Sequence, residues 1–215
     1  MRFDEDVFST NANYEILLDR RKVATTKTYN STTKKTTITL PWATTSDVEV
    51  ISTDTDPTDP VSGYRHSVTK VSTSSVTVDG DITTHTVTVG IPYTFSYQFS
   101  TQYFRAGKGT GEVVVLDGRM QLRYITVEYH NTAYFQTTVK LPGRDAFTQV
   151  FNGQVTGSDT TILGQQSFST GKHRIPVMGK NLDVVVTITN DSPFPHAFGS
   201  AEWQGIISPK SATRV

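Results

Sequence analysis

Apolar and polar residues alternate one by one along most of the chain, which is the pattern of half-buried β-strands. The run Thr36–Leu40 alternates and stops at Pro41, and Asp47–Ile51 alternates as well. The one short helical candidate is Asn13–Leu18, and its apolar run also fits a buried strand. Helical periodicity is nearly absent elsewhere. The pattern therefore predicts an all-β fold with less than about a tenth helix.

Two Asp-Gly pairs lie between alternating runs and predict β-hairpins, because a type I′ turn needs positive φ at both central residues. Asp79-Gly80 separates Ser75–Val78 from Ile82–Val89. Asp117-Gly118 lies in the same way between a short apolar run and Arg119–Glu128. We expect both pairs to turn the chain directly back onto the preceding strand.

Later strands are expected in five ranges: Tyr134–Leu141, Thr160–Ser167, Lys172–Met178, Leu182–Thr189 and Ala197–Ile207. Many short strands separated by turn residues are typical of a sandwich or a barrel. We expect an antiparallel β-sandwich, or two packed β-domains of that kind.

Composition changes near Gly90–Pro92 and divides the chain into two predicted segments. Residues 1–91 form a Thr-rich β-segment with an acidic loop at 52–62, and residues 92–215 form an aromatic-rich β-sandwich. Aromatic side chains bury large areas, so the second segment should hold the larger core. Trp203 lies in an alternating run, and we expect its ring to pack against that core; an exposed partner-binding anchor is the alternative.

The overall composition narrows the function classes. The chain has 20 Lys and Arg against 20 Asp and Glu, so it lacks the strongly basic footprint of most duplex-binding proteins. It contains no Cys, which excludes disulfides, thiolate metal sites and a Cys nucleophile. Its 36 Thr and 18 Ser favour pleated, uncharged polar surfaces. No apolar run approaches the ~20 residues of a membrane helix, so no membrane span is expected.

The inventory of catalytic side chains is small, and we predict no catalytic residue, no cofactor and no enzyme activity. No two of the five His have the spacing of metal ligands, and no Gly-x-Ser-x-Gly elbow occurs. Glu112, Glu128 and Glu202 are carboxylates within strand patterns. A glycosidase pair would have to face across a cleft, and a solvated strand face is the preferred interpretation.

Two loops carry weaker signals. Asp54, Asp56 and Asp59 are calcium candidates, because alternating Asp can supply hard oxygen ligands. The loop lacks the glycine and terminal Glu of an EF-hand, and Asp, Thr and Pro suit turns directly, so we prefer a turn and predict no metal. Ala106–Gly111, which contains Lys108, is interpreted as a hairpin loop, because no helix follows to complete a phosphate cradle.

Several motifs together resemble the tail tubular protein B, or nozzle protein, family of short-tailed phages. These motifs are Ile91–Ser100, Gly118–Tyr124, Val127–Tyr129, Thr170–Gly179 and Ser200–Gly205. Nozzle proteins of this family are several times longer than 215 residues, so the chain resembles only their C-terminal portion.

The resemblance implies a structural protein of the viral tail. It implies a homo-oligomeric ring, a hexamer, that forms the conduit for DNA ejection. The implied partners are the tail adaptor protein, the tail fibres and, transiently, the passing double-stranded DNA. A near-neutral chain suits a conduit, because strong phosphate contacts would retard passage.

Ring assembly suggests a use for sheet edges, whose unpaired backbone groups must be covered. We expect Thr36–Leu40 to be such an edge, covered by a neighbouring subunit or by further chain. The isolated chain should be monomeric or weakly associating and should bind duplex DNA poorly. Two alternatives remain open: a carbohydrate- or receptor-binding β-sandwich of a phage tail, and a glycan-cleaving tail enzyme with a carboxylate pair.

Overall fold

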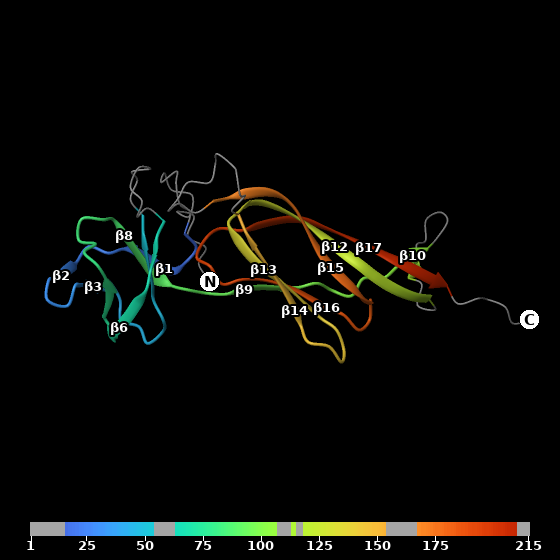
Figure 1. The fold of residues 1–215 in the computed structure, drawn as a ribbon, viewed down its shortest axis with the longest axis horizontal. Coiled ribbons are helices and arrows are strands. Elements are labelled where there is room, and N and C mark those ends of the chain that lie inside the picture. Colours follow the sequence, from blue (N-terminus) through green and yellow to red (C-terminus); the bar gives the residue numbers. More distant parts are fainter. Residues whose placement is uncertain (1–15, 54–62, 107–112, 115–117, 154–166, 210–215) are drawn as a thin grey trace, which may run out of the picture. The chain divides into compact units, whose positions relative to one another are not determined.

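A computed structural model describes residues 16–53, 63–106, 113–114, 118–153 and 167–209 (Figure 1). These residues form strands and turns and include no helix. The chain gathers into two compact units. The first comprises Met1–Thr94, Gly153–Phe168 and Asp191–Pro195, and the second comprises Phe95–Asn152, Ser169–Asn190 and His196–Val215. The all-β prediction is confirmed, and each unit is described below by itself.

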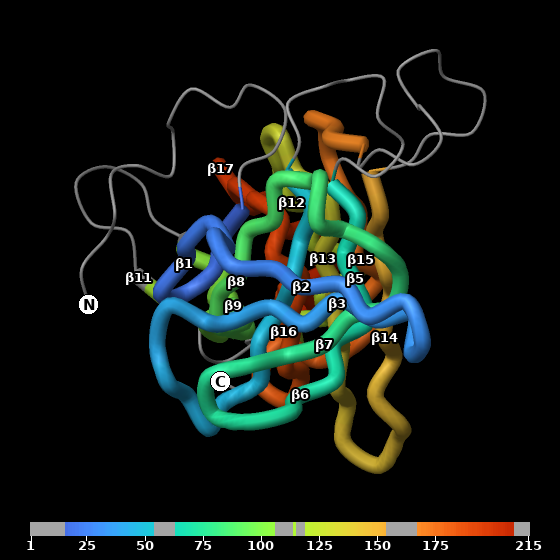
Figure 2. Tube along the Cα trace, turned by 90° about the vertical axis from the view of Figure 1, so that its left-hand side faces the viewer, coloured from blue at the N-terminus to red at the C-terminus, as the bar shows by residue number. Residues whose placement is uncertain are grey.

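The first unit contains two four-stranded antiparallel sheets. The first sheet has the order β2-β3-β7-β6, and its strands follow one another in this order in Figure 2. Its strands are β2 (Lys27–Asn30), β3 (Lys35–Thr39), β7 (Ser75–Asp79) and β6 (Val68–Ser72). The second sheet has the order β1-β8-β4-β5. Its strands are β1 (Asp19–Val23), β8 (Val87–Ile91), β4 (Glu49–Ser52) and β5 (Arg65–His66).

The expectation that Thr36–Leu40 forms a sheet edge is wrong, because β3 lies between β2 and β7 and pairs with both. Thr36 is fully buried, and its hydroxyl donates a hydrogen bond of 2.6 Å to the carbonyl of Gly80. The same oxygen accepts a bond of 3.2 Å from the backbone N–H of Ile82. Buried polar groups need such partners, so the β-branched Thr suits an interior strand here.

The predicted hairpin at Asp79-Gly80 is also wrong. Gly80 does adopt the positive φ expected of a turn, at 88°. However, β7 pairs with β3 and β6, whereas β8 pairs with β1 and β4 in the other sheet. The turn therefore carries the chain from one sheet to the other. Ile82, which follows it, is buried in the core together with Val87 and Val89 of β8.

The second unit contains a four-stranded and a three-stranded antiparallel sheet and a short strand pair. The four-stranded sheet has the order β14-β13-β16-β9 and the three-stranded sheet the order β15-β12-β17. The strands are β9 (Phe95–Gln98), β12 (Gly118–Thr132), β13 (Tyr134–Lys140), β14 (Phe147–Asn152), β15 (Ser169–Lys180), β16 (Val185–Asn190) and β17 (Ala197–Pro209). The short pair joins β10 (Arg105–Ala106) to β11 (Val113–Val114).

The two larger sheets of this unit share one hydrophobic core, which defines a β-sandwich. Leu122, Ile125 and Ile175 come from the three-stranded sheet, and Phe135 and Ile188 come from the four-stranded sheet. All five are at most 1% exposed. The side chain of Trp203 is partly buried and packs against this cluster. The aromatic core expected for the C-terminal segment is therefore present, with Trp203 at its margin.

Most of the later strands lie where the alternation pattern predicts them. The exceptions are one strand that was not predicted and ranges that lie outside the described residues. β13, β15, β16 and β17 cover the predicted ranges closely, whereas β14 was not predicted. The expected strand Thr160–Ser167 lies, except for its last residue, outside the described residues. Asp117 also lies outside them, and the described Val113–Val114 pairs with Arg105–Ala106.

Candidate functional site

The sequence candidates for ion and phosphate binding fall largely outside the described residues. This holds for Asp54, Asp56 and Asp59 and for all of Ala106–Gly111 except Ala106, and the candidate carboxylate Glu112 lies outside the described residues as well. Among the residues that are described, no group of three or more His, Asp or Glu could hold a metal ion. The preferred turn at Asp54–Asp59 and its weaker alternative, a calcium site, therefore both stay predictions.

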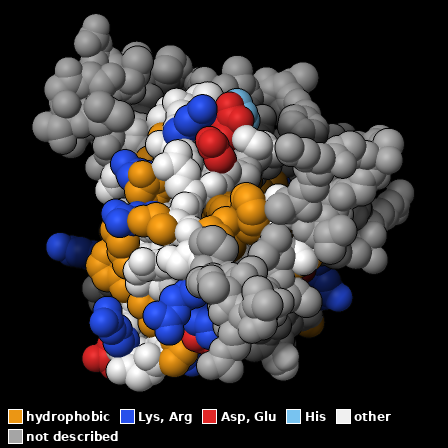
Figure 3. Space-filling view, turned by 90° about the vertical axis from the view of Figure 1, so that its right-hand side faces the viewer, with side chains coloured by type: hydrophobic (Ala, Val, Ile, Leu, Met, Phe, Trp, Pro, Cys, Tyr) orange, Lys and Arg blue, Asp and Glu red, His pale blue; other side chains and the backbone are white. Residues whose placement is uncertain are grey.

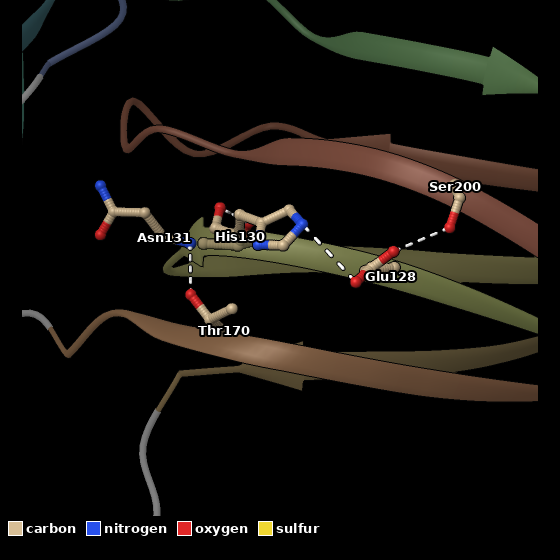
Figure 4. A network of polar contacts seen from close by, with 6 residues as sticks. Glu128, His130, Asn131, Thr170 and Ser200 are labelled. Atoms are coloured by element: carbon tan, nitrogen blue, oxygen red, sulfur yellow. Dashed lines mark hydrogen bonds and ion pairs between the residues drawn. The ribbon is translucent and has the colours of Figure 1, made fainter.

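Glu128 and Glu202, the other candidate carboxylates, lie on the outer face of the three-stranded sheet. Figure 4 shows the polar network around Glu128. The hydroxyl of Ser200 donates a hydrogen bond of 2.9 Å to Glu128 Oε2, and His130 Nε2 lies 3.8 Å from Glu128 Oε1. Glu128 is 39% exposed, which agrees with a solvated strand face.

The geometry of this network suits binding rather than nucleophilic catalysis. A nucleophilic Ser needs a general base within hydrogen-bond reach of its hydroxyl, with a third group orienting that base. The hydroxyl of Ser200 is hydrogen-bonded to a carboxylate, and the imidazole of His130 lies on the other side of that carboxylate. At the same end of the sheet, the backbone N–H of Asn131 donates a bond of 3.0 Å to Thr170 Oγ1.

The same outer face carries a row of cations along β15. Buried Ile175 and Val177 alternate with outward side chains. The outward side chains of this strand, from Lys172 on, are Lys172, Arg174, Pro176, Met178 and Lys180. The guanidinium carbon of Arg174 lies 3.3 Å from the ring centroid of Tyr124 on β12, a cation–π contact. Hydrophobic side chains adjoin Lys and Arg side chains on the face of the molecule shown in Figure 3.

The outer face of the four-stranded sheet has the opposite character. Ladder pairing places Thr138 beside Thr187 and Thr148, and Thr187 beside Gln98. The hydroxyl groups of Thr138 and Thr148 lie 3.1 Å apart and are hydrogen-bonded. The outward residues of this sheet are Ser96, Gln98, Tyr134, Gln136, Thr138, Lys140, Thr148, Val150, Asn152, Val185, Thr187 and Thr189. Only Lys140, at the end of its strand, is charged.

An aromatic groove opens along β9 and β17, which are edge strands of the two sheets. It has a volume of 390 Å³, and its aromatic lining is Phe95, Tyr97, Phe99, His196 and Phe198. Tyr97 is 52% exposed although it lies on the same side of β9 as the half-buried Phe95. A neighbouring hollow of 320 Å³ shares Phe99 and Ala201 with the groove and extends it to Trp203.

Burial shifts the pKa of titratable groups in both units. Burial lowers the pKa of His173, whose ring lies against Phe135 with centroids 5.1 Å apart. In the first unit, burial lowers the pKa of His66 and raises that of Glu49, with the ion-paired Arg65 opposing the shift at Glu49. A catalytic arrangement would combine such a group with a second titratable residue in a cleft. Among the described residues, none of these three groups forms one.

Sequence analysis did not identify the two sheet faces or the groove. The period-two spacing of Lys172, Arg174 and Lys180 was a usable signal, because residues two apart share one face of a strand. The stacking of Arg174 on Tyr124 and the meeting of β9 with β17 depend on pairing between distant segments. A local sequence pattern does not reveal which distant segments lie side by side.

The described surfaces of this all-β chain are suited to binding and packing against partners. These properties place the chain in the class of structural and recognition proteins. A family model gives the particular assignment: residues 1–214 match the bacteriophage nozzle protein family, and the chain belongs to that family. It is therefore a structural protein of the phage tail and a component of the virion. A search of curated proteins gives no match.

Across the described ranges, no helix has the length and apolar character needed to span a bilayer.

Proposed function

We propose that this chain is part of the tail nozzle ring of a short-tailed phage and lines the conduit through which DNA is ejected. The observation that carries the proposal is the hydroxyl-rich outer face of the β14-β13-β16-β9 sheet. Thr138, Thr187 and Thr189 occupy the middle of this face, and its one charge, Lys140, is at the end of a strand. A face with a single cation at its margin forms few phosphate contacts, so DNA can pass it without being held.

The ring in this proposal is built from copies of the chain around the DNA path. The family resemblance implies six copies, with the adaptor protein above the ring and tail fibres attached to it. The contact with passing double-stranded DNA is transient, and the chain carries out no catalysis. Membership of the nozzle family supports the tail location, whereas stoichiometry and partners belong to the proposal.

Placing cations on the hydroxyl-rich face tests the conduit. Virions that carry Thr138→Lys and Thr187→Lys should eject DNA more slowly, because each new contact with a phosphate adds about 1.5–3 kcal/mol of binding. The defect should shrink as salt rises, since screening weakens such contacts. The matched control is Thr138→Ser with Thr187→Ser, which keeps the hydroxyls. An unchanged ejection rate in assembled virions that carry the Lys variants would contradict the conduit assignment for this face.

A second candidate function is glycan binding by the aromatic groove. The observation that favours it is the exposed ring of Tyr97 beside Phe95, because sugars stack on exposed aromatic rings. A glycan array with and without calcium tests this function, with Tyr97→Ala as the variant. Calcium-dependent binding would also bear on Asp54, Asp56 and Asp59. Loss of binding in Tyr97→Ala places the sugar in the groove, and an array without any signal removes this candidate.

A further inference from the structure

The outer face of the β15-β12-β17 sheet has the composition of a protein–protein interface. Tyr124 of β12 lies in its centre and pairs with Pro176 on one side and Gln204 on the other. Exposed apolar side chains flank it, with Met178 at 52% and Ile206 at 47% exposure. Tyr, Met and Arg are enriched in interfaces relative to the remaining surface.

Cations surround this apolar centre. Lys172, Arg174 and Lys180 point outward from β15, and Arg119 points outward from β12. The carboxylates on the face are Glu128 and Glu202, so these four cations outnumber them by two, and Arg123 at the bulge of β12 is a further exposed cation. The guanidinium of Arg174 rests on the Tyr124 ring, which limits its freedom and leaves its N–H donors available for a carboxylate. We call these four cations, with Tyr124, Pro176, Met178 and Ile206, the basic face.

The neutral total of the chain conceals a strong separation of charge between its units. The first unit holds 9 of the 20 Lys and Arg and 14 of the 20 Asp and Glu, which gives a formal charge of −5. The second unit holds the other 11 cations and 6 anions, which gives +5. Opposite potentials on two surfaces steer association and fix which surfaces meet.

An acidic stretch without Lys or Arg lies within the first unit. Between Val50 and Tyr64 the sequence contains Asp54, Asp56 and Asp59 and no Lys or Arg. The strands on either side, β4 and β5, are paired at Val50 with His66 and at Ile51 with Arg65. The stretch is therefore a connection between two paired strands of the first unit.

We propose that the basic face of one copy binds the Asp54–Asp59 stretch in the first unit of a second copy. The two surfaces differ, so the contact is head-to-tail, and repeated contacts of this kind close into a ring when the rotation permits. The inference rests on the ring proposed above and names the surfaces that join its subunits. The proposed DNA conduit assigns no role to the basic face, and this contact gives the face one.

A charge swap between two variants tests the pairing. Variant A carries Lys172→Glu, Arg174→Glu and Lys180→Glu, and variant B carries Asp54→Lys, Asp56→Lys and Asp59→Lys. Sedimentation velocity of the 215-residue chain at high protein concentration and low salt measures association. The wild type should associate weakly, A and B should each be monomeric, and an equal mixture of A and B should associate at least as strongly as the wild type. Arg144→Glu, which changes an exposed cation away from the basic face, should associate like the wild type.

The outcomes separate this inference from the ring itself. If A and B alone each associate like the wild type, the ring stands and the basic face is not its interface. The same measurement is expected if the two surfaces meet within one chain, which also contradicts the proposed contact between copies. If the mixture stays monomeric, the pairing is wrong. If duplex DNA binds the wild type, dissociates its oligomers and fails to bind A, the basic face is a nucleic-acid surface and the inference is overturned. If the wild type is monomeric even at low salt and high protein concentration, the pairing of the basic face with the Asp54–Asp59 stretch is overturned.

Discussion

Trp203 illustrates how one side chain connects an edge strand to the core. It is partly buried, pairs across the ladder with Ile125, and packs against the core of the second unit. Trp203→Ala should lower the free energy of unfolding by about 3 kcal/mol, the lower end of the range for large aromatic truncations, because part of the ring is exposed. Urea unfolding measures this change. Gln204→Ala, at the exposed neighbouring position, is the control and should change stability by less than about 0.5 kcal/mol. Unchanged stability in Trp203→Ala with lost assembly would identify Trp203 as a partner-binding anchor.

His173 makes the stability of the second unit depend on pH. Burial places its folded-state pKa below the ordinary value of 6.5. As pH falls below 6.5, the unfolded chain therefore takes up the proton first, and the unfolding free energy decreases toward the folded-state pKa. The contribution is complete above the unfolded pKa. The slope between pH 7 and pH 5 should be smaller in His173→Phe, because a phenyl ring can take the place of the imidazole against Phe135 and Phe151 and binds no proton. His130→Gln, at a position whose side chain is 52% exposed, is the control; an equal loss of slope there would argue against His173 as the cause.

At the scale of the element, the pairing of β12 with β17 depends on a glycine. A Cβ added at Gly205 would lie 2.7 Å from the backbone carbonyl oxygen of Gln121. Since backbone on a neighbouring strand cannot easily move aside, Gly205→Ala should destabilise the protein by about 1–3 kcal/mol. Gly199→Ala on the same strand is the matched control, because its Cβ would meet side chains and no backbone: His130 at 3.3 Å and Glu128 at 3.9 Å. Thermal unfolding compares the two variants, and equal losses of stability would contradict the role of the close backbone approach.

Strands were predictable from sequence where one face is buried, and their partners were not. In β13 and β16 buried and less buried residues alternate strictly, so the period-two pattern located both strands. β14 escaped prediction because Phe147 and Val150 are exposed, so its burial does not follow a simple alternation. Asp79-Gly80 has the residues of a hairpin turn, but buried contacts of Thr36 and Ile82 direct the chain into another sheet. The same limit applies to the basic face and the groove, whose residues meet only through ladder pairing.

At the scale of the whole molecule, each unit has its own core and its own tryptophan. Trp42 packs against the core of the first unit, and its Nε1 donates a bond of 2.9 Å to the carbonyl of Arg20. Trp203 belongs to the second unit, and the chain has 2 Trp in total. Fluorescence of the single-tryptophan variants Trp42→Phe and Trp203→Phe therefore reports each unit separately.

A core substitution in one unit should shift the transition of that unit most. Ile175→Ala truncates a fully buried side chain of the second unit, and should destabilise it by about 2–5 kcal/mol. The unfolding transition reported by Trp203 should move accordingly, and the one reported by Trp42 should move less. Ile38→Ala in the first unit should give the reverse pattern. Identical shifts at both tryptophans would show that the units unfold as one cooperative body.

The way the chain is divided between the units has a mechanical consequence. The chain crosses from one unit to the other five times, after Thr94, Asn152, Phe168, Asn190 and Pro195. Tension that pulls the units apart is therefore shared among five covalent connections in parallel, whereas two domains in series are held by a single linker. A break in one of these connections leaves four to hold the load. Such redundancy suits a structural protein of the phage tail, because no single peptide segment has to carry the whole force.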